Sequence, residues 1–191
     1  MPLFLPPALV QAHPADAKLL HALSEALEGA PEALTDRRPA RAKSEAIKAL
    51  ALWDRNQSAV LATLPATDQD ALVKAMDRLR LAKGDEAGFV ALDAMEILER
   101  RLPEGRLQWL AAADRLGMRG WILLGEGKTE LPDLDAVFMV LMDNDGGKHA
   151  SVVAKTRIEL ERYHAALAQK ELPVAQKAVG VLLDLVDDFE K

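Results

Sequence analysis

The stretch AQKAVGVLLDLVDDF, residues 175–189, shows most plainly how this chain folds. Small and apolar residues recur in it at intervals of three and four: Ala175, Ala178, Val179, Leu182, Leu185, Val186 and Phe189. This near-heptad spacing is typical of a helix with one wide buried face. We predict a helix whose apolar face enters the core of the chain, with a homodimer formed through this C-terminal helix as the alternative.

The segment just before it has the same character. Leu160, Tyr163 and Leu167 line one side of a predicted helix over about 149–169. Lys155 and Glu159 are four residues apart on its polar side, a spacing that supports a solvent-facing helical surface. The two segments together predict an antiparallel helical hairpin.

Further toward the N-terminus, apolar residues keep a helical period, and Gly or Pro interrupts them. Ala, Leu, Glu, Lys and Arg are strong helix formers, so the local propensity agrees with the pattern. The first helix is expected to end at Gly29, which would adopt the left-handed conformation that closes many helices. Further helices are predicted over about 40–56, 67–83, 86–102 and 103–116. The fold class is therefore all-α, an irregular bundle or orthogonal array of seven or eight helices.

The segment from Gly117 to Gly127 is ambiguous. The run Trp121–Leu124 can form a buried strand, a short helix or a core-filling loop, because short apolar runs do not distinguish these states. The run 137–142 has the same ambiguity, although Asp133 and Asp135 favour a helix start. A short β-hairpin near residues 121–142 is the one exception to an all-helical chain that the sequence allows.

Length and composition bound the organisation. A chain of 191 residues, half of them hydrophobic, can form a single helical domain, residues 1–191. The alternative is a helical array over 1–117 followed by a helical hairpin over 130–191. The absence of cysteine excludes disulfides, cysteine zinc sites and thiolate nucleophiles.

The N-terminal residues MPLFLPPALVQAHP contain no basic residue, which argues against a signal peptide. No segment has the roughly 20 uninterrupted apolar residues of a membrane span. We expect a cytoplasmic protein that does not enter membranes.

No motif in the chain is complete enough to indicate catalysis. The run GEGKT at 125–129 has Ile122 where a phosphate-binding loop needs its first glycine, and Pro132 leaves no room for the following helix. Glu161 and His164 form one E-x-x-H, whereas a di-iron bundle needs two. The sequence therefore predicts no catalytic, cofactor-binding or metal-binding residues, and Asp184, Asp187 and Asp188 are interpreted as a solvated helix face.

A DNA-binding helix-turn-helix is also disfavoured. Residues 111–118 have the small residues and the glycine of its first helix and turn, but residues 119–126 offer almost no polar side chains for base edges. The segment is interpreted instead as a helix that ends at Gly117 and is followed by buried chain.

Charge segregation is the one feature that suggests a contact surface. The candidate contacts for a partner protein or nucleic acid are Arg37, Arg38, Arg41, Lys43, Lys48, Arg115 and Arg119. The net charge of −6 argues against non-specific nucleic-acid binding, although a local basic face can override it.

These features favour a non-enzymatic adaptor that acts through protein–protein contacts. One alternative is a DNA-associated regulator that touches phosphates. The other is an enzyme with an unfamiliar helical site, built from Glu161, His164, Asp143 or Asp145.

Overall fold

The computed structural model of the chain describes residues 14–191, with side chains from residue 17 onward. The expectation that the N-terminus is not a signal peptide falls on residues 1–13, outside the described part. The described residues form eight helices and no strand: α1 Pro14–Thr35, α2 Pro39–Ala62, α3 Ala66–Leu81, α4 Asp85–Glu99, α5 Arg106–Gly125, α6 Leu134–Asp143, α7 Ala150–Ala168 and α8 Leu172–Glu190. The all-α prediction is confirmed, and none of the described helices is long and apolar enough to cross a membrane.

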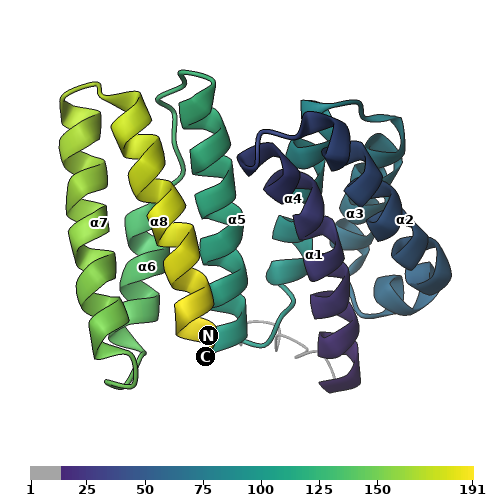
Figure 1. Cartoon of the computed structure of the whole chain (residues 1–191). Helices are drawn as coiled ribbons and strands as arrows, with labels where there is room; N and C mark the ends of the chain where they lie inside the picture. The colour runs from purple at the N-terminus through teal and green to yellow at the C-terminus, as the bar shows by residue number, and fades with distance from the viewer. Residues whose placement is uncertain (1–13) are drawn as a thin grey trace, which may run out of the picture.

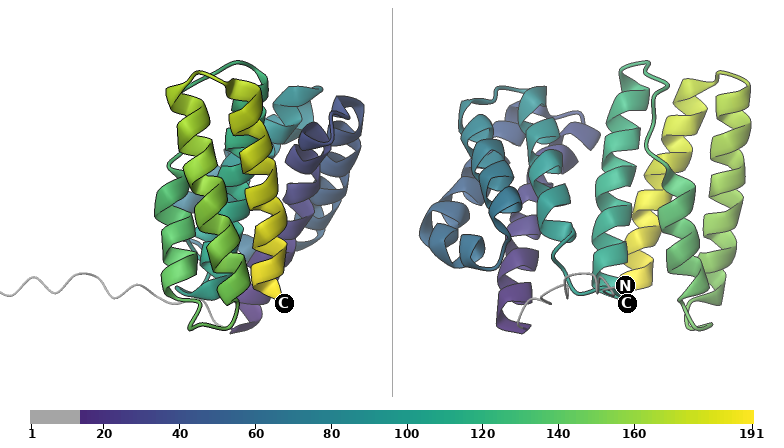
Figure 2. Two further views of the ribbon diagram at one scale, coloured as in Figure 1. Left: turned by 60° about the vertical axis from the view of Figure 1, so that its left-hand side comes forward. Right: turned by 180° about the vertical axis from the view of Figure 1, so that it is seen from behind.

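The helices form two halves that meet along α5 (Figures 1 and 2). In the first half, α1 packs against α2 and α4, and α3 packs against α4. In the second half, α8 lies between α5 and α7, which confirms the helical hairpin expected at the C-terminus. Helix α5 also contacts α1 and α4, so it is the element that joins the two halves.

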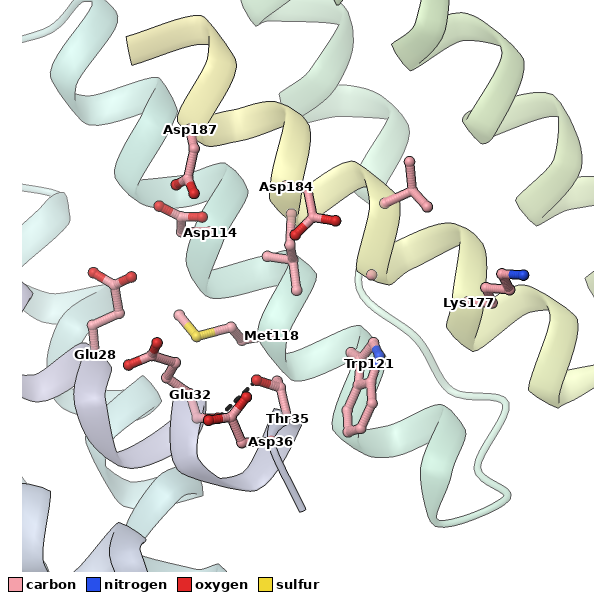
Figure 3. Close-up of a pocket in the computed structure, with 13 residues that line it drawn as sticks. Glu28, Glu32, Thr35, Asp36, Asp114, Met118, Trp121, Lys177, Asp184 and Asp187 are labelled. Carbon is pink, nitrogen blue, oxygen red and sulfur yellow. Dashed lines mark hydrogen bonds between the residues drawn. The ribbon is translucent and has the colours of Figure 1, made fainter. Parts of the chain in front are cut away.

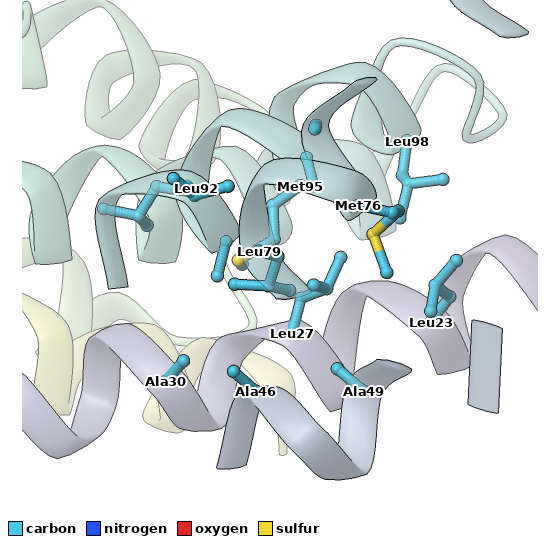
Figure 4. Packing of buried hydrophobic residues seen from close by; sticks show 14 of the residues in the cluster. Leu23, Leu27, Ala30, Ala46, Ala49, Met76, Leu79, Leu92, Met95 and Leu98 are labelled. Atoms are coloured by element: carbon cyan, nitrogen blue, oxygen red, sulfur yellow. The ribbon is translucent and has the colours of Figure 1, made fainter. Parts of the chain in front are cut away.

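A cluster of aliphatic side chains fills the first half (Figure 4). Leu23 and Leu27 of α1 point between α2 and α4, where Met76, Leu79 and Leu98 meet them. These residues are almost completely buried, and each burial contributes roughly 1.5–3 kcal/mol to folding. Alanines such as Ala46 let α1 and α2 approach closely.

The second half has its own buried cluster, in which α8 is the central helix. The whole apolar stripe of α8, from Ala175 to Phe189, is buried inside the chain. A homodimer through this helix stays a prediction, and the stripe that suggested it is already covered. Trp121 packs against both clusters, so the halves share a side chain at their junction. The division into one domain or two stays a prediction as well.

The expected alternative of a β-hairpin near residues 121–142 is wrong. Helix α5 continues through Trp121 to Gly125, and residues 134–143 form α6. Asp133 caps the start of α6, because its side chain accepts a hydrogen bond from the backbone N–H of Ala136 at 3.1 Å. The pattern was ambiguous because α5 is buried on two sides. Ile122 enters the first cluster and Leu124 the second, so the apolar run shows no single stripe.

Two glycines that were expected to end helices lie inside them. Helix α1 continues past Gly29 to Thr35, and α5 continues past Gly117 to Gly125. A Cβ atom at Gly29 would lie 3.2 Å from the Cβ of Glu45 in α2, and one at Gly117 would lie 2.6 Å from Cδ2 of Leu183 in α8. Both glycines therefore serve close helix packing. The continuous α5 also removes the turn that a helix-turn-helix needs at residue 117.

Candidate binding groove

A groove of about 530 Å³ lies where α1, α5 and α8 meet (Figure 3). Each helix presents one stripe of side chains to it at helical spacing. Its lining residues are Glu28, Glu32, Thr35, Asp36, Asp114, Met118, Trp121, Lys177, Gly180, Val181, Leu183, Asp184 and Asp187. The groove thus takes residues from both halves of the molecule, and its volume is in the range of ligand-binding sites.

The apolar part of the lining comes mainly from α5 and α8. Met118 and Trp121 lie one turn apart on α5, opposite Val181 and Leu183 of α8. Gln176 donates a hydrogen bond to the carbonyl oxygen of Trp121 at 3.0 Å, which ties the two helices together beside the indole ring. An aromatic ring and aliphatic side chains at the base of a groove can bind the hydrocarbon portion of a ligand.

Carboxyl groups dominate the rest of the lining. Asp114 and Asp187 lie close together where α5 faces α8, and Glu28 of α1 faces them from the other half (Figure 3). Lys177 is the one basic residue that lines the groove among the described residues, and it lies ten residues from Asp187. Ten residues span about 15 Å along a helix, so this ammonium group is far from the Glu28–Asp114 end.

The environment of these carboxyls raises two of their pKa values. Burial, followed by the negative charges of Glu32, Glu190, Asp187 and Glu25, raises the pKa of Glu28 to about 7. Burial, followed by the charges of Glu28, Asp187, Glu190 and Glu99, raises the pKa of Asp114 to about 8. Both directions follow from the same fact, that an ionised carboxylate is costly where water is partly excluded and nearby charges are negative.

Two of the basic residues proposed as partner contacts face the other side of α5. Arg115 is buried, and its Nε donates to Oε2 of Glu99 at 2.7 Å. One turn later, Arg119 donates to Asp93 of α4 at 2.5 Å. The two arginines therefore form ion pairs between α5 and α4.

Three further candidates on α2 also have partners within the chain. Arg41 and Lys48 both pair with Glu45, at 3.1 and 2.7 Å. Lys43 donates to the backbone carbonyl oxygens of Leu79 and Arg80 at the end of α3. The Glu45 pairs compensate charge within α2, and the Lys43 contacts join α2 to α3.

Arg37 and Arg38 are exposed and lie in the turn between α1 and α2. The structure does not gather all seven basic residues on one surface, because Arg115 is buried and Arg119 is paired with Asp93 on the α4 side of α5. The role of the set as a partner or nucleic-acid contact stays a prediction.

The residues considered for an enzymatic site do not come together. His164 pairs with Asp135 of α6 at 2.8 Å on the surface, while Glu161 and Asp143 are exposed. Asp145 is buried, accepts a hydrogen bond from the backbone N–H of His149, and contacts its ring at 2.5 Å. The hydrogen bond from the backbone N–H of His149 lowers the pKa of Asp145, and it lies at the start of α7. No group of three or more His, Asp or Glu side chains in residues 17–191 is arranged to hold a metal ion.

The groove itself was not anticipated, although its residues were visible. The sequence pattern alone predicts a solvated helix face at Asp184 and Asp187. The available signal was a shared i, i+4, i+7 spacing, at 28, 32 and 35 on α1 and at 114, 118 and 121 on α5. Comparisons with known protein families, with characterised proteins and with solved structures found no match to this chain.

Proposed function

We propose that this protein is a non-enzymatic binding protein whose groove takes basic side chains from a segment of a partner protein. The observation that supports it is the groove at the junction of the halves, with an apolar base and a rim of carboxylates. Lysine and arginine combine an aliphatic stem with a charged end. The stem would lie on Met118 and Trp121, and the charged end would reach Asp184 or Asp187.

The size of the groove and its charges define the partner further. A volume of about 530 Å³ accommodates a few long side chains rather than a whole helix, so a short basic segment is the expected occupant. Bound ammonium or guanidinium groups would compensate carboxylates that the chain leaves largely without nearby cations. Charge complementarity of this kind gives specificity and faster association. We place this activity in the cytoplasm, in line with the absence of cysteine.

A direct test uses two fluorescein-labelled peptides with the same alternating pattern, one of leucine and lysine and the other of leucine and glutamate. The lysine peptide should bind, and the glutamate peptide should not. Asp184→Asn/Asp187→Asn should weaken binding by roughly fivefold to tenfold, because it removes two rim charges. Asp70→Asn/Glu171→Gln removes two exposed carboxylates elsewhere and should leave the affinity unchanged.

Other outcomes would overturn the proposal. Equal loss of affinity in both double variants would show binding through overall charge alone. Displacement of the peptide by spermidine at matched charge concentration would assign the groove to small polyamines. Salt-sensitive binding of a DNA duplex that Arg37→Glu/Arg38→Glu abolishes, with no peptide binding, would favour the DNA-associated alternative.

A further inference from the structure

The junction between the halves differs on the two sides of α5. On the α4 side, opposite charges meet: Arg115 with Glu99 and Arg119 with Asp93. On the α1 and α8 side, the facing charges have the same sign, with Glu28 against Asp114 and Asp187. One edge of the junction is therefore held by ion pairs, and the other carries like charges.

The groups around Glu28 and Asp114 come from every helix that packs there. Helix α1 adds His21, Glu25 and Glu32, helix α8 adds Asp187 and Glu190, and helix α4 adds Glu99. His21 lines a smaller hollow that shares Glu28, Asp114 and Asp187 with the groove, and its Nε2 lies 3.4 Å from Glu25. Arg115 is turned toward Glu99, and Lys177 is distant along α8.

We propose that the junction is a pH-sensitive hinge: protons on Glu28 and Asp114, which lie beside Asp187, keep α1 against α5, and ionisation opens this edge while the α4–α5 edge stays in contact. The proposal concerns the chain by itself and does not depend on what fills the groove. Most of each buried cluster lies within its own half, and the side chains shared at the junction are mainly Met118, Trp121 and Ile122 of α5, so opening at this edge leaves most of each core in place.

The direction of the effect follows from the raised pKa values of Glu28 and Asp114. In an open junction these carboxyls are hydrated and ionise near their ordinary range, whereas in the closed junction they keep protons to about pH 7–8. Between the ordinary pKa values of these carboxyls and about pH 7–8, the closed form therefore binds more protons than the open form. Closure is favoured at low pH, weakens as the pH rises through about 7–8, and changes little above that.

The test measures the distance between the halves in the full chain. The sequence has no cysteine, so spin labels can be attached at Ser58→Cys on α2 and Ala154→Cys on α7, both exposed positions. Pulsed electron paramagnetic resonance should give a longer or broader distribution of distances between the two spin labels at about pH 9 than at about pH 5.5. In Glu28→Gln/Asp114→Asn the distribution should stay short at both values.

Two further variants keep the result interpretable. Asp187→Asn/Glu190→Gln changes only exposed groups, so it tests the cluster even where the first double variant fails to fold, and it should reduce the pH-dependent lengthening. Asp70→Asn/Glu171→Gln should preserve the full lengthening. The proposal is overturned by a wild-type distance that does not change with pH, by equal lengthening in all variants, or by lengthening accompanied by loss of the helical circular dichroism signal.

Discussion

Glu99 of α4 and Arg115 of α5 form an ion pair that is buried between the two halves, with 2.7 Å between Oε2 and Nε. Glu99 is only 3 % exposed, so its charge has little access to water. Burial raises the pKa of Glu99 to about 7, while Arg115 acts in the opposite direction and favours the ionised form. The pair therefore joins the halves at a considerable desolvation cost.

Removal of one partner of this ion pair is expected to lower the free energy of unfolding more than removal of both. Arg115→Met leaves a buried carboxylate alone and should lower the free energy of unfolding in urea by about 3–5 kcal/mol. Glu99→Leu/Arg115→Met replaces the pair with apolar groups and should recover most of that loss. A single variant as stable as the wild type would show that the pair is not buried in solution.

The sequence predicted the helices well because their apolar stripes are a local property. It also correctly placed the C-terminal hairpin, whose two segments are adjacent along the chain. The groove could not be predicted in the same way, because Glu28, Asp114 and Asp187 lie far apart in sequence and meet only through packing. In the sequence, the spacing of Asp187 is that of any solvent-exposed carboxylate on a helix, and only the structure shows that it faces α1.

Helix ends were predicted less well, for a reason visible at two residues. Gly29 was expected to close α1, but it is used for close contact with Glu45, and the helix ends two turns later. The closing residue in the left-handed conformation is Arg37, with φ of 58°. Sequence identity alone does not separate a glycine that ends a helix from one that allows another helix to approach.

The ends of α1 and α7 predict two stabilising substitutions. Arg38 N–H donates to the carbonyl oxygen of Ala33, and Glu171 N–H to that of Ala166, the bond that closes a helix when the residue before the donor is left-handed. Those residues are Arg37 and Lys170, with φ of 58° and 59°. Arg37→Gly and Lys170→Gly should each raise the free energy of unfolding by about 0.5–1 kcal/mol, because glycine adopts this conformation without strain.

The same measurement has a built-in control at the end of α5. Gly127 has a φ of 75°, and the N–H of Lys128 after it donates to the carbonyl oxygen of Leu123 in an equivalent closure. Gly127→Ala should lower the free energy of unfolding by about 1 kcal/mol. Destabilisation by Lys170→Gly would contradict the assigned helix end.

A contact between α1 and α4 predicts that replacing one helical glycine lowers the stability of the chain. A Cβ atom at Gly88 would lie 2.4 Å from Cδ1 of Leu34 and 3.3 Å from the Cα of Pro31. The buried side chain of Leu34 would have to shift, and the Cα of Pro31 is backbone that cannot adjust as a side chain does. Gly88→Ala should lower the midpoint of thermal unfolding, at a cost of about 1–2 kcal/mol after its gain in helix propensity.

Gly120 of α5 provides the matched comparison. A Cβ atom there would have no contact closer than 3.6 Å, an ordinary van der Waals separation. Gly120→Ala should therefore be neutral or stabilising by up to about 1 kcal/mol. Equal effects of the two substitutions would show that α1 and α4 are not as close as described.

Asp114 predicts a stability difference that changes with pH. Its pKa in the folded chain is about 8 against an ordinary 3.8, so the folded state binds more protons than the unfolded state between these values. Its contribution to stability is therefore fully present below about pH 4, declines as the pH rises, and is lost above about pH 8. Asp114→Asn removes the ionisation and should leave stability almost unchanged at low pH.

At about pH 8.5, Asp114→Asn should raise the free energy of unfolding by about 1–3 kcal/mol, a value discounted because the carboxyl is only half-buried. Urea unfolding of wild type and variant at several pH values gives the difference directly, and common contributions from other groups cancel. Asp70→Asn, at an exposed position, should show no such trend. A variant that is less stable than the wild type at high pH would mean that the Asp114 carboxylate is compensated by a cation, and that the groove is not the uncompensated acidic surface argued from its lining.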